Sequence, residues 1–143
     1  RYEAAWAPLP GALQAPLWAL LHDNRRVATL HQPRYSIVSY AWGTRYQQSN
    51  QWAIETLALA AEPGVASRAQ AQAWLRRQAY QPAVLRIGAL TRLGGRVGAA
   101  NVAFDDHPNA QRFADRIETV TADSVLDWLA ATLPGGAPVR QLR

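Results

Sequence analysis

A serine at the start of a predicted helix is the residue of this chain best placed to do chemistry. Ser49 follows the polar run 44–48 and precedes residues 50–61, whose apolar side chains recur at helical spacing. A side chain at that point faces unpaired backbone N–H groups and the positive end of the helix dipole. The position therefore suits a helix cap, an anion site or a nucleophile.

Amides and aromatic rings surround Ser49, where a solvated helix end usually carries charged residues. An ordinary N-cap is the simplest role for such a serine. As a nucleophile it needs an adjacent general base, because a neutral hydroxyl attacks poorly. Gln48 or Gln47 would then orient the reacting groups or stabilise an oxyanion. The other side chains expected to line a ligand cleft around this segment are Tyr46, Asn50, Trp42 and Trp52.

A second polar cluster, Asp105-Asp106-His107, follows a predicted strand at 102–104. Two carboxylates and an imidazole suit either a divalent metal or an Asp–His pair that serves Ser49. Alternate side chains of a strand point to opposite faces, so a metal would need a turn that brings Asp105 and His107 together. An Asx-type turn is the simpler interpretation. We predict no metal and no cofactor, and we keep His107 as a candidate catalytic base and Asp105 as a candidate ligand-binding residue.

The spacing of apolar residues and the capping residues predict the helices that must hold these groups. Ser67 and Gln70 form a capping box at the start of one helix. Thr121 or Asp123 caps the last one. The predicted helices cover residues 10–21, 25–31, 50–61, 67–80 and 121–133.

Strands are expected where β-branched and aromatic residues gather, at 2–7, 35–42, 102–104 and 117–120. Residues 82–93 fit either a proline-started helix or a strand at 84–87, and we favour the helix. The glycines at 94, 95 and 98 are expected to form a flexible link. The last three strands should form a small, mainly antiparallel sheet against the helix that starts at Ser49. The predicted fold is α+β, with four or five helices.

Composition limits the class of protein. The 143 residues are enough for one domain with its own core, which we place at 1–133 with a flexible tail at 134–143. No apolar run is long enough to span a bilayer, and the absence of cysteine excludes disulfides and thiolate sites. All 15 cationic side chains are arginine, and the net charge is +5. These arginines are spread along the chain instead of clustered, so we expect no nucleic-acid partner.

Three segments resemble a known family. Residues 46–52, 101–108 and 119–125 are similar to an uncharacterised family of secreted proteobacterial proteins, and the similarity covers most of the chain. The first segment also resembles, more distantly, the nucleophile segment of permuted papain-like cell-wall hydrolases, in which a cysteine opens the central helix. Ser49 takes the place of that cysteine, with Gln48 as the preceding amide and Trp52 as the following aromatic residue. The resemblance implies part of a permuted papain-like fold in a periplasmic or secreted protein.

In the permuted hydrolases the catalytic histidine precedes the nucleophile and lies on a strand. Upstream of Ser49 the chain offers His22 and His31, and neither lies in a strand pattern. The chain starts at Arg1 and contains no methionine, so we expect that an upstream segment has been removed. A histidine that matches the family pattern is expected in that segment, if the site has one.

We therefore favour a non-catalytic or weakly catalytic extracytoplasmic domain. Its papain-like cleft would bind a peptide, a glycan of the cell wall or a partner subunit. The alternative is an envelope hydrolase of amide or ester bonds with Ser49 as the nucleophile. The sequence predicts no particular oligomeric state.

Overall fold

The computed structural model describes residues 4–98, 100–132 and 140–142. This part of the chain forms seven helices and two separate two-stranded antiparallel sheets, so the predicted α+β class is confirmed. None of the helices within these ranges has the length and apolar character needed to cross a bilayer.

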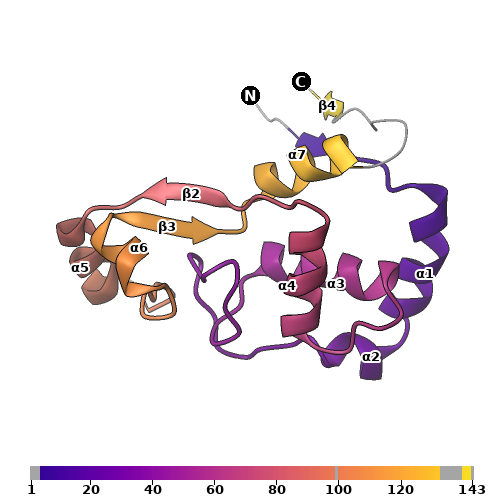
Figure 1. The fold of residues 1–143 in the computed structure, drawn as a ribbon, viewed down its shortest axis with the longest axis horizontal. Coiled ribbons are helices and arrows are strands. Elements are labelled where there is room, and N and C mark those ends of the chain that lie inside the picture. Colours follow the sequence, from indigo (N-terminus) through magenta and orange to yellow (C-terminus); the bar gives the residue numbers. More distant parts are fainter. Residues whose placement is uncertain (1–3, 99, 133–139, 143) are drawn as a thin grey trace.

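A bundle of helices forms the main body of the molecule. Its members are α1 (Gly11–Leu21), α2 (Asn24–Ala28), α3 (Ser49–Ala61) and α4 (Arg68–Arg77). Helix α3 lies at the centre, where it contacts α1, α4 and α7 (Ala122–Thr132) (Figure 1). The core around it consists of buried apolar side chains: Leu20, Leu30, Ile54, Ala58, Leu59, Ala71, Leu75, Val120 and Leu129.

A two-stranded ribbon projects from this body. Strand β2 (Ala83–Arg86) pairs antiparallel with β3 (Arg116–Thr119). Helices α5 (Ala89–Gly98) and α6 (Asn109–Phe113) lie at the far end of the ribbon (Figure 1). Helix α7 follows β3 and leads the chain back to the body, so α7 lies next to the base of the ribbon.

The second sheet joins the two ends of the described chain. Strand β1 (Ala4–Trp6) pairs antiparallel with β4 (Arg140–Leu142). The expected early strand is therefore confirmed in its central part. The tail was expected to be flexible; residues 134–139 lie outside the described part of the chain.

The strands predicted at 35–42 and 102–104 are wrong. The two segments do lie side by side, but they are held by buried serine hydroxyls and turns. Ser36 accepts from the N–H of Ala103 and donates to the carbonyl of the same residue, both at 3.0 Å. Ser39 N–H bonds back to the carbonyl of Ser36, which closes a turn where a strand would have to be extended. The expected sheet against α3 is therefore replaced by turns and the end of β3.

The interpretation of residues 82–93 as a helix is wrong in its first half. Residues 83–86 form β2 because they find a partner in β3, about 30 residues later in the chain. The second half, with the predicted flexible glycines at 94, 95 and 98, forms the continuous helix α5.

The starts of α4 and α7 were predicted more reliably than the strands. Ser67 accepts from the N–H of Gln70 at 3.3 Å, as the capping box indicates. At the start of α7 the hydroxyl of Thr121 accepts from the N–H of Ser124 at 3.1 Å. The predicted end of this helix at Leu133 lies outside the described residues.

Candidate functional site

Ser49 is the first residue of α3, and its side chain is exposed. The helix begins one residue earlier than predicted, so Gln48 occupies the N-cap position and no side chain caps the helix. Within the described residues the Ser49 hydroxyl makes no hydrogen bond. The prediction that Ser49 is an N-cap is therefore wrong, because the extended backbone that a cap requires belongs to Gln48.

Gln48 turns its amide away from the helix end and towards the ribbon. The amide nitrogen donates to the hydroxyl of Thr119 at 3.2 Å and to the carbonyl of Val120. The amide of Asn50 lies 3.5 Å from the same carbonyl. Both amides therefore attach the start of α3 to the end of β3, and neither faces an open cleft in this arrangement.

His107 is buried and has an acceptor at each ring nitrogen. Its Nδ1 lies 3.0 Å from a carboxylate oxygen of Asp106, and its Nε2 lies 3.1 Å from the carbonyl oxygen of Glu118. The second oxygen of Asp106 accepts from the N–H of Tyr40 at 2.7 Å. Asp106 and His107 thus connect the loop at 36–43 to β3. With both nitrogens occupied, His107 offers Ser49 no free base, and the proposed catalytic role stays a prediction without support from this geometry.

Asp105 points away from that pair. One of its oxygens pairs with the exposed guanidinium of Arg45 at 3.0 Å. Burial is the main cause that raises the pKa of Tyr46 above its ordinary value, and the negative charge of Asp105 raises this pKa further. The three residues of the predicted polar cluster therefore have different partners. No group of three potential metal ligands occurs anywhere within the described ranges.

The start of α3 is organised by a charged residue that the sequence interpretation passed over. Glu55 has no exposed surface. Its carboxylate accepts from Arg68 at 2.7 and 3.2 Å, from the amide of Gln72 at 2.8 Å, and from the amide of Gln47 at 2.9 Å. Each carboxylate oxygen therefore has two donors, which is the condition for burying an ionised group.

Arg68 extends this network to the backbone in front of α3. Its guanidinium donates to the carbonyl oxygens of Gly43, Thr44 and Tyr46 at 3.0 to 3.1 Å. Gln51 donates to further carbonyls of the same loop and accepts from the hydroxyl of Ser39 at 2.9 Å. The network fixes the approach to α3 as structure, and its polar groups are already satisfied by one another.

Helical spacing was the signal that could have revealed this network. Gln51 and Glu55 stand four residues apart on one helix, as do Arg68 and Gln72 on the next. Residues at that spacing share a face. Two such polar pairs, one on each helix, predict a buried polar contact between the helices.

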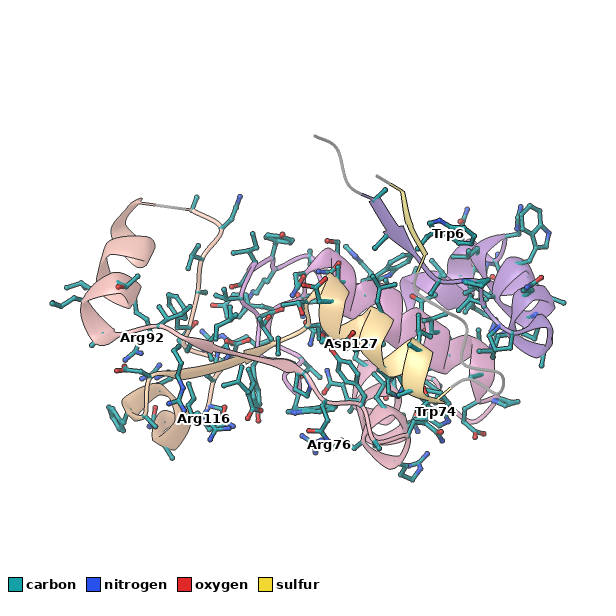
Figure 2. The ribbon with its side chains drawn as sticks, turned by 90° about the horizontal axis from the view of Figure 1, so that it is seen from above. Trp6, Trp74, Arg76, Arg92, Arg116 and Asp127 are labelled. Atoms are coloured by element: carbon teal, nitrogen blue, oxygen red, sulfur yellow. The ribbon has the colours of Figure 1, made fainter. Side chains whose placement is uncertain are left out.

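The two tryptophans predicted as cleft walls lie in different surroundings. Trp42 packs edge-on against Tyr80, with 6.0 Å between the ring centroids, and lies under the guanidinium of Arg76 at 4.4 Å. These three residues line a hollow of about 250 Å³ at the surface. Trp52 is half-buried on α3 and does not line that hollow. Arg76 is labelled in Figure 2.

A larger pocket, of about 660 Å³, lies between β2 and α7. Its charged lining residues, Asp123 and Asp127, stand four residues apart on α7, and Asp127 is labelled on that helix in Figure 2. Trp128 is a buried residue of the pocket lining, and it donates its indole N–H to the carbonyl of Gln78 at 2.9 Å. The lining consists of Ala79, Gln81, Pro82, Ala83, Leu85, Thr121, Asp123, Ser124, Asp127, Trp128, Ala131 and Thr132, and includes none of the predicted site residues.

A buried tyrosine supports the wall of this pocket. The hydroxyl of Tyr80 lies 2.8 Å from that of Ser124, and its ring packs edge-on against Trp128 at 6.0 Å. Burial raises the pKa of Tyr80 to about 12, and the hydrogen bond between Tyr80 and Ser124 opposes part of this rise. The segment that follows α4 is thereby attached to α7 directly behind the pocket.

The chain matches a family described as an uncharacterized protein conserved in bacteria, DUF2145, over residues 1–129. It therefore belongs to this family, and the expected membership of an uncharacterised bacterial family is confirmed. Neither a curated protein nor a solved structure matches the chain. Secretion, a proteobacterial origin and the papain-like resemblance stay predictions.

Proposed function

We propose that this member of the DUF2145 family is a non-catalytic binding domain whose ligand lies in the pocket between β2 and α7. The pocket itself carries the proposal. Its volume of about 660 Å³ lies in the range of ligand sites, which is on the order of 300–1,000 Å³. Apolar walls with a few polar groups at fixed positions are also typical of such sites.

The geometry around Ser49 supports binding over catalysis. The hydroxyl is exposed, and within the described residues His107 offers it no free ring nitrogen, because Asp106 and Glu118 occupy both. The surrounding amides are engaged in buried contacts with the backbone and with Glu55. A nucleophilic hydroxyl needs a neighbouring group to take its proton.

Among the expected ligand classes, the pocket favours a peptide. Leu85, Pro82 and Trp128 give it an apolar surface, and Thr121 and Ser124 already bond to each other. A glycan presents many hydroxyls and would leave several of them unpaired against such walls, at a cost for each. An apolar or long aliphatic side chain of a peptide fits the same surface without this cost.

One observation keeps the hydrolase as a second candidate. Ser49 stands exposed at the N-terminus of a 13-residue helix, where the dipole would stabilise an oxyanion. A fluorophosphonate probe tests this directly. Labelling of the wild type and its loss in Ser49→Ala would establish a reactive serine; absence of labelling is the result that we expect.

A periplasmic or secreted location is also part of the proposal, and it rests on the resemblance of residues 46–52, 101–108 and 119–125. Fractionation of bacteria that produce the native protein tests it. We expect the protein in the periplasm or the medium, and a protein confined to the cytosol would contradict this location.

Selection from a displayed library of random short peptides, with a glycan array in parallel, tests the binding function. The counter-target is Ala131→Trp, which places a large ring at the exposed rim of the pocket. We expect peptides that bind the wild type and lose binding to this variant. Peptides that bind the wild type and Ala131→Trp equally would reject the pocket as a peptide site. Binding to glycans on the array with no peptide selected from the library would reject it as well.

A further inference from the structure

Strand β2 has an edge without a backbone partner. The N–H of Ile87 bonds to the carbonyl of Asp115, directly beyond the last pair of the ribbon. Hydrogen-bonded and non-bonded pairs alternate in an antiparallel ladder. Leu85 and Ala83 therefore bond across to β3, and the N–H and carbonyl groups of Val84 and Arg86 point outwards.

The opposite strand confirms this alternation. Glu118 is the partner of Val84 in the register, so its carbonyl must also point outwards. It accepts there from the N–H of Ala41 at 3.1 Å and faces Nε2 of His107. The outer edge of β3 is thus covered by the loop at 36–43. On the β2 side, Val84 and Arg86 have no backbone hydrogen-bond partner among the residues that the structure describes.

The open edge borders the pocket. The side chains of Ala83 and Leu85 line the pocket, whereas Val84 and Arg86 are exposed on the other face of the ribbon. A strand added beside β2 would lie about 4.8 Å away and would direct every second side chain to the pocket face. In Figure 1, β2 is the upper strand of the ribbon, and its right-hand end lies near α7.

The charge of the pocket is opposite to that of the chain. Asp123 and Asp127 are its charged lining residues, both are exposed, and neither forms an ion pair with another described residue. The whole chain carries a net charge of +5. Residues four apart on a helix face the same side, so the two carboxylates can meet one cation. A cationic side chain complements this surface better than an anionic or a neutral one.

We infer that the ligand is an extended peptide that joins β2 as a third strand and directs a lysine or arginine side chain to Asp123 and Asp127. The inference rests on the proposed binding function and specifies its ligand. Backbone hydrogen bonds to Val84 and Arg86 would supply affinity for any extended segment. The pocket would select the side chains at alternate positions, as in other cases of strand addition.

Backbone methylation of the ligand tests the added strand. The probe is a short synthetic peptide that alternates valine and threonine around a central lysine, together with its singly N-methylated derivatives. Because only every second amide of an added strand bonds to β2, we expect N-methylation to weaken binding by about fivefold or more at alternate positions. Methylation at the intervening positions should have little effect. Loss of affinity without this two-residue period would overturn the inference.

Two further variants test the charge and the edge. Asp127→Asn should weaken binding of the lysine peptide several-fold and leave unchanged the binding of the same peptide with norleucine in place of lysine. Arg86→Pro removes an outward N–H, and proline is tolerated on such an edge. This variant should weaken the binding of both the lysine and the norleucine peptide, and its far-ultraviolet circular dichroism spectrum should be unchanged. Equal effects of Asp127→Asn on the two peptides would reject the cationic anchor.

The outcomes separate this inference from the proposed function. If library-selected peptides bind in the pocket but show no two-residue period on N-methylation, strand addition is wrong and the binding function stands. If neither the alternating peptides nor any library peptide binds, both are wrong. If peptides bind equally to wild type and Arg86→Pro, the edge of β2 is not used.

Discussion

Glu55 shows how one buried charge determines the local structure. Its carboxylate has no exposed surface and lies between two helices and the loop in front of α3. Desolvation of an ion pair is costly, and only a full set of donors offsets it. Arg68, Gln72 and Gln47 provide that set. The geometry of the loop then follows from the carbonyl groups that Arg68 binds.

Removal of one residue of this buried ion pair should therefore destabilise the fold strongly. We expect Glu55→Ala to lower the free energy of unfolding by about 3–5 kcal/mol, because it leaves the guanidinium of Arg68 buried without its counter-charge. Arg45→Ala is the control, since the guanidinium of Arg45 is exposed where it pairs with the half-buried Asp105, and it should cost less than about 1 kcal/mol. Urea denaturation measures both. Similar losses for the two variants would show that the buried network does not stabilise the fold.

The two serines at helix starts should behave differently. Ser67 caps α4 through the N–H of Gln70, so Ser67→Ala should cost about 1 kcal/mol. Ser49 is already inside α3 and makes no cap bond, so Ser49→Ala should change stability by less than about 0.5 kcal/mol. The same urea titrations compare them. A larger cost for Ser49→Ala would restore its role as a cap.

At the scale of elements, we expect the contact between α7 and the segment that follows α4 to depend on pH. The pKa of Tyr80 is raised from 10.0 to about 12, so the folded state holds this proton more strongly than the unfolded chain. The resulting stabilisation is fully present below pH 10 and is lost as the pH rises towards 12. The difference of about two pKa units corresponds to about 3 kcal/mol.

Tyr80→Phe separates this effect from the other tyrosines. At neutral pH we expect the variant to be less stable by about 1 kcal/mol, since it loses the hydrogen bond to Ser124. Near pH 12 the variant should be the more stable of the two proteins, because ionisation of the buried phenol then destabilises the wild type. Every cationic side chain is arginine, so no lysine titrates in this range. Parallel loss of stability in both proteins would assign the pH dependence to other groups.

Helices were largely predictable because their signals are local. The cap at Ser67 and the spacing of apolar residues in α3 are both readable within a few residues. Strands depended on partners far away in the chain. Residues 35–42 have a strand-like composition, yet the turn at Ser36–Ser39 and the contacts to residues 101–103 hold them as a loop. Strand β2 forms because β3 is there to pair with it.

The candidate site was missed for a reason that belongs to the whole molecule. The pocket is built from β2, the segment that follows α4, and α7, which come together only where the base of the ribbon meets the helical body (Figure 1). No short segment contains both walls. The one local signal was the pair Asp123 and Asp127, four residues apart beside Trp128. By contrast, the segment around Ser49 looked informative because it is polar and aromatic, and most of those side chains serve the buried network.

The affinity of one library-selected peptide for four proteins tests the central claim most directly. The proteins are the wild type, Ala131→Trp at the pocket rim, Ala53→Trp as a matched substitution on the exposed face of α3, and Ser49→Ala. By isothermal titration we expect Ala131→Trp to bind the peptide about tenfold or more weakly, which corresponds to about 1.4 kcal/mol of binding free energy. The affinities of the other two variants should match that of the wild type. If Ser49→Ala abolishes binding and Ala131→Trp retains it, the functional site lies at the start of α3 and the pocket between β2 and α7 is not the binding site.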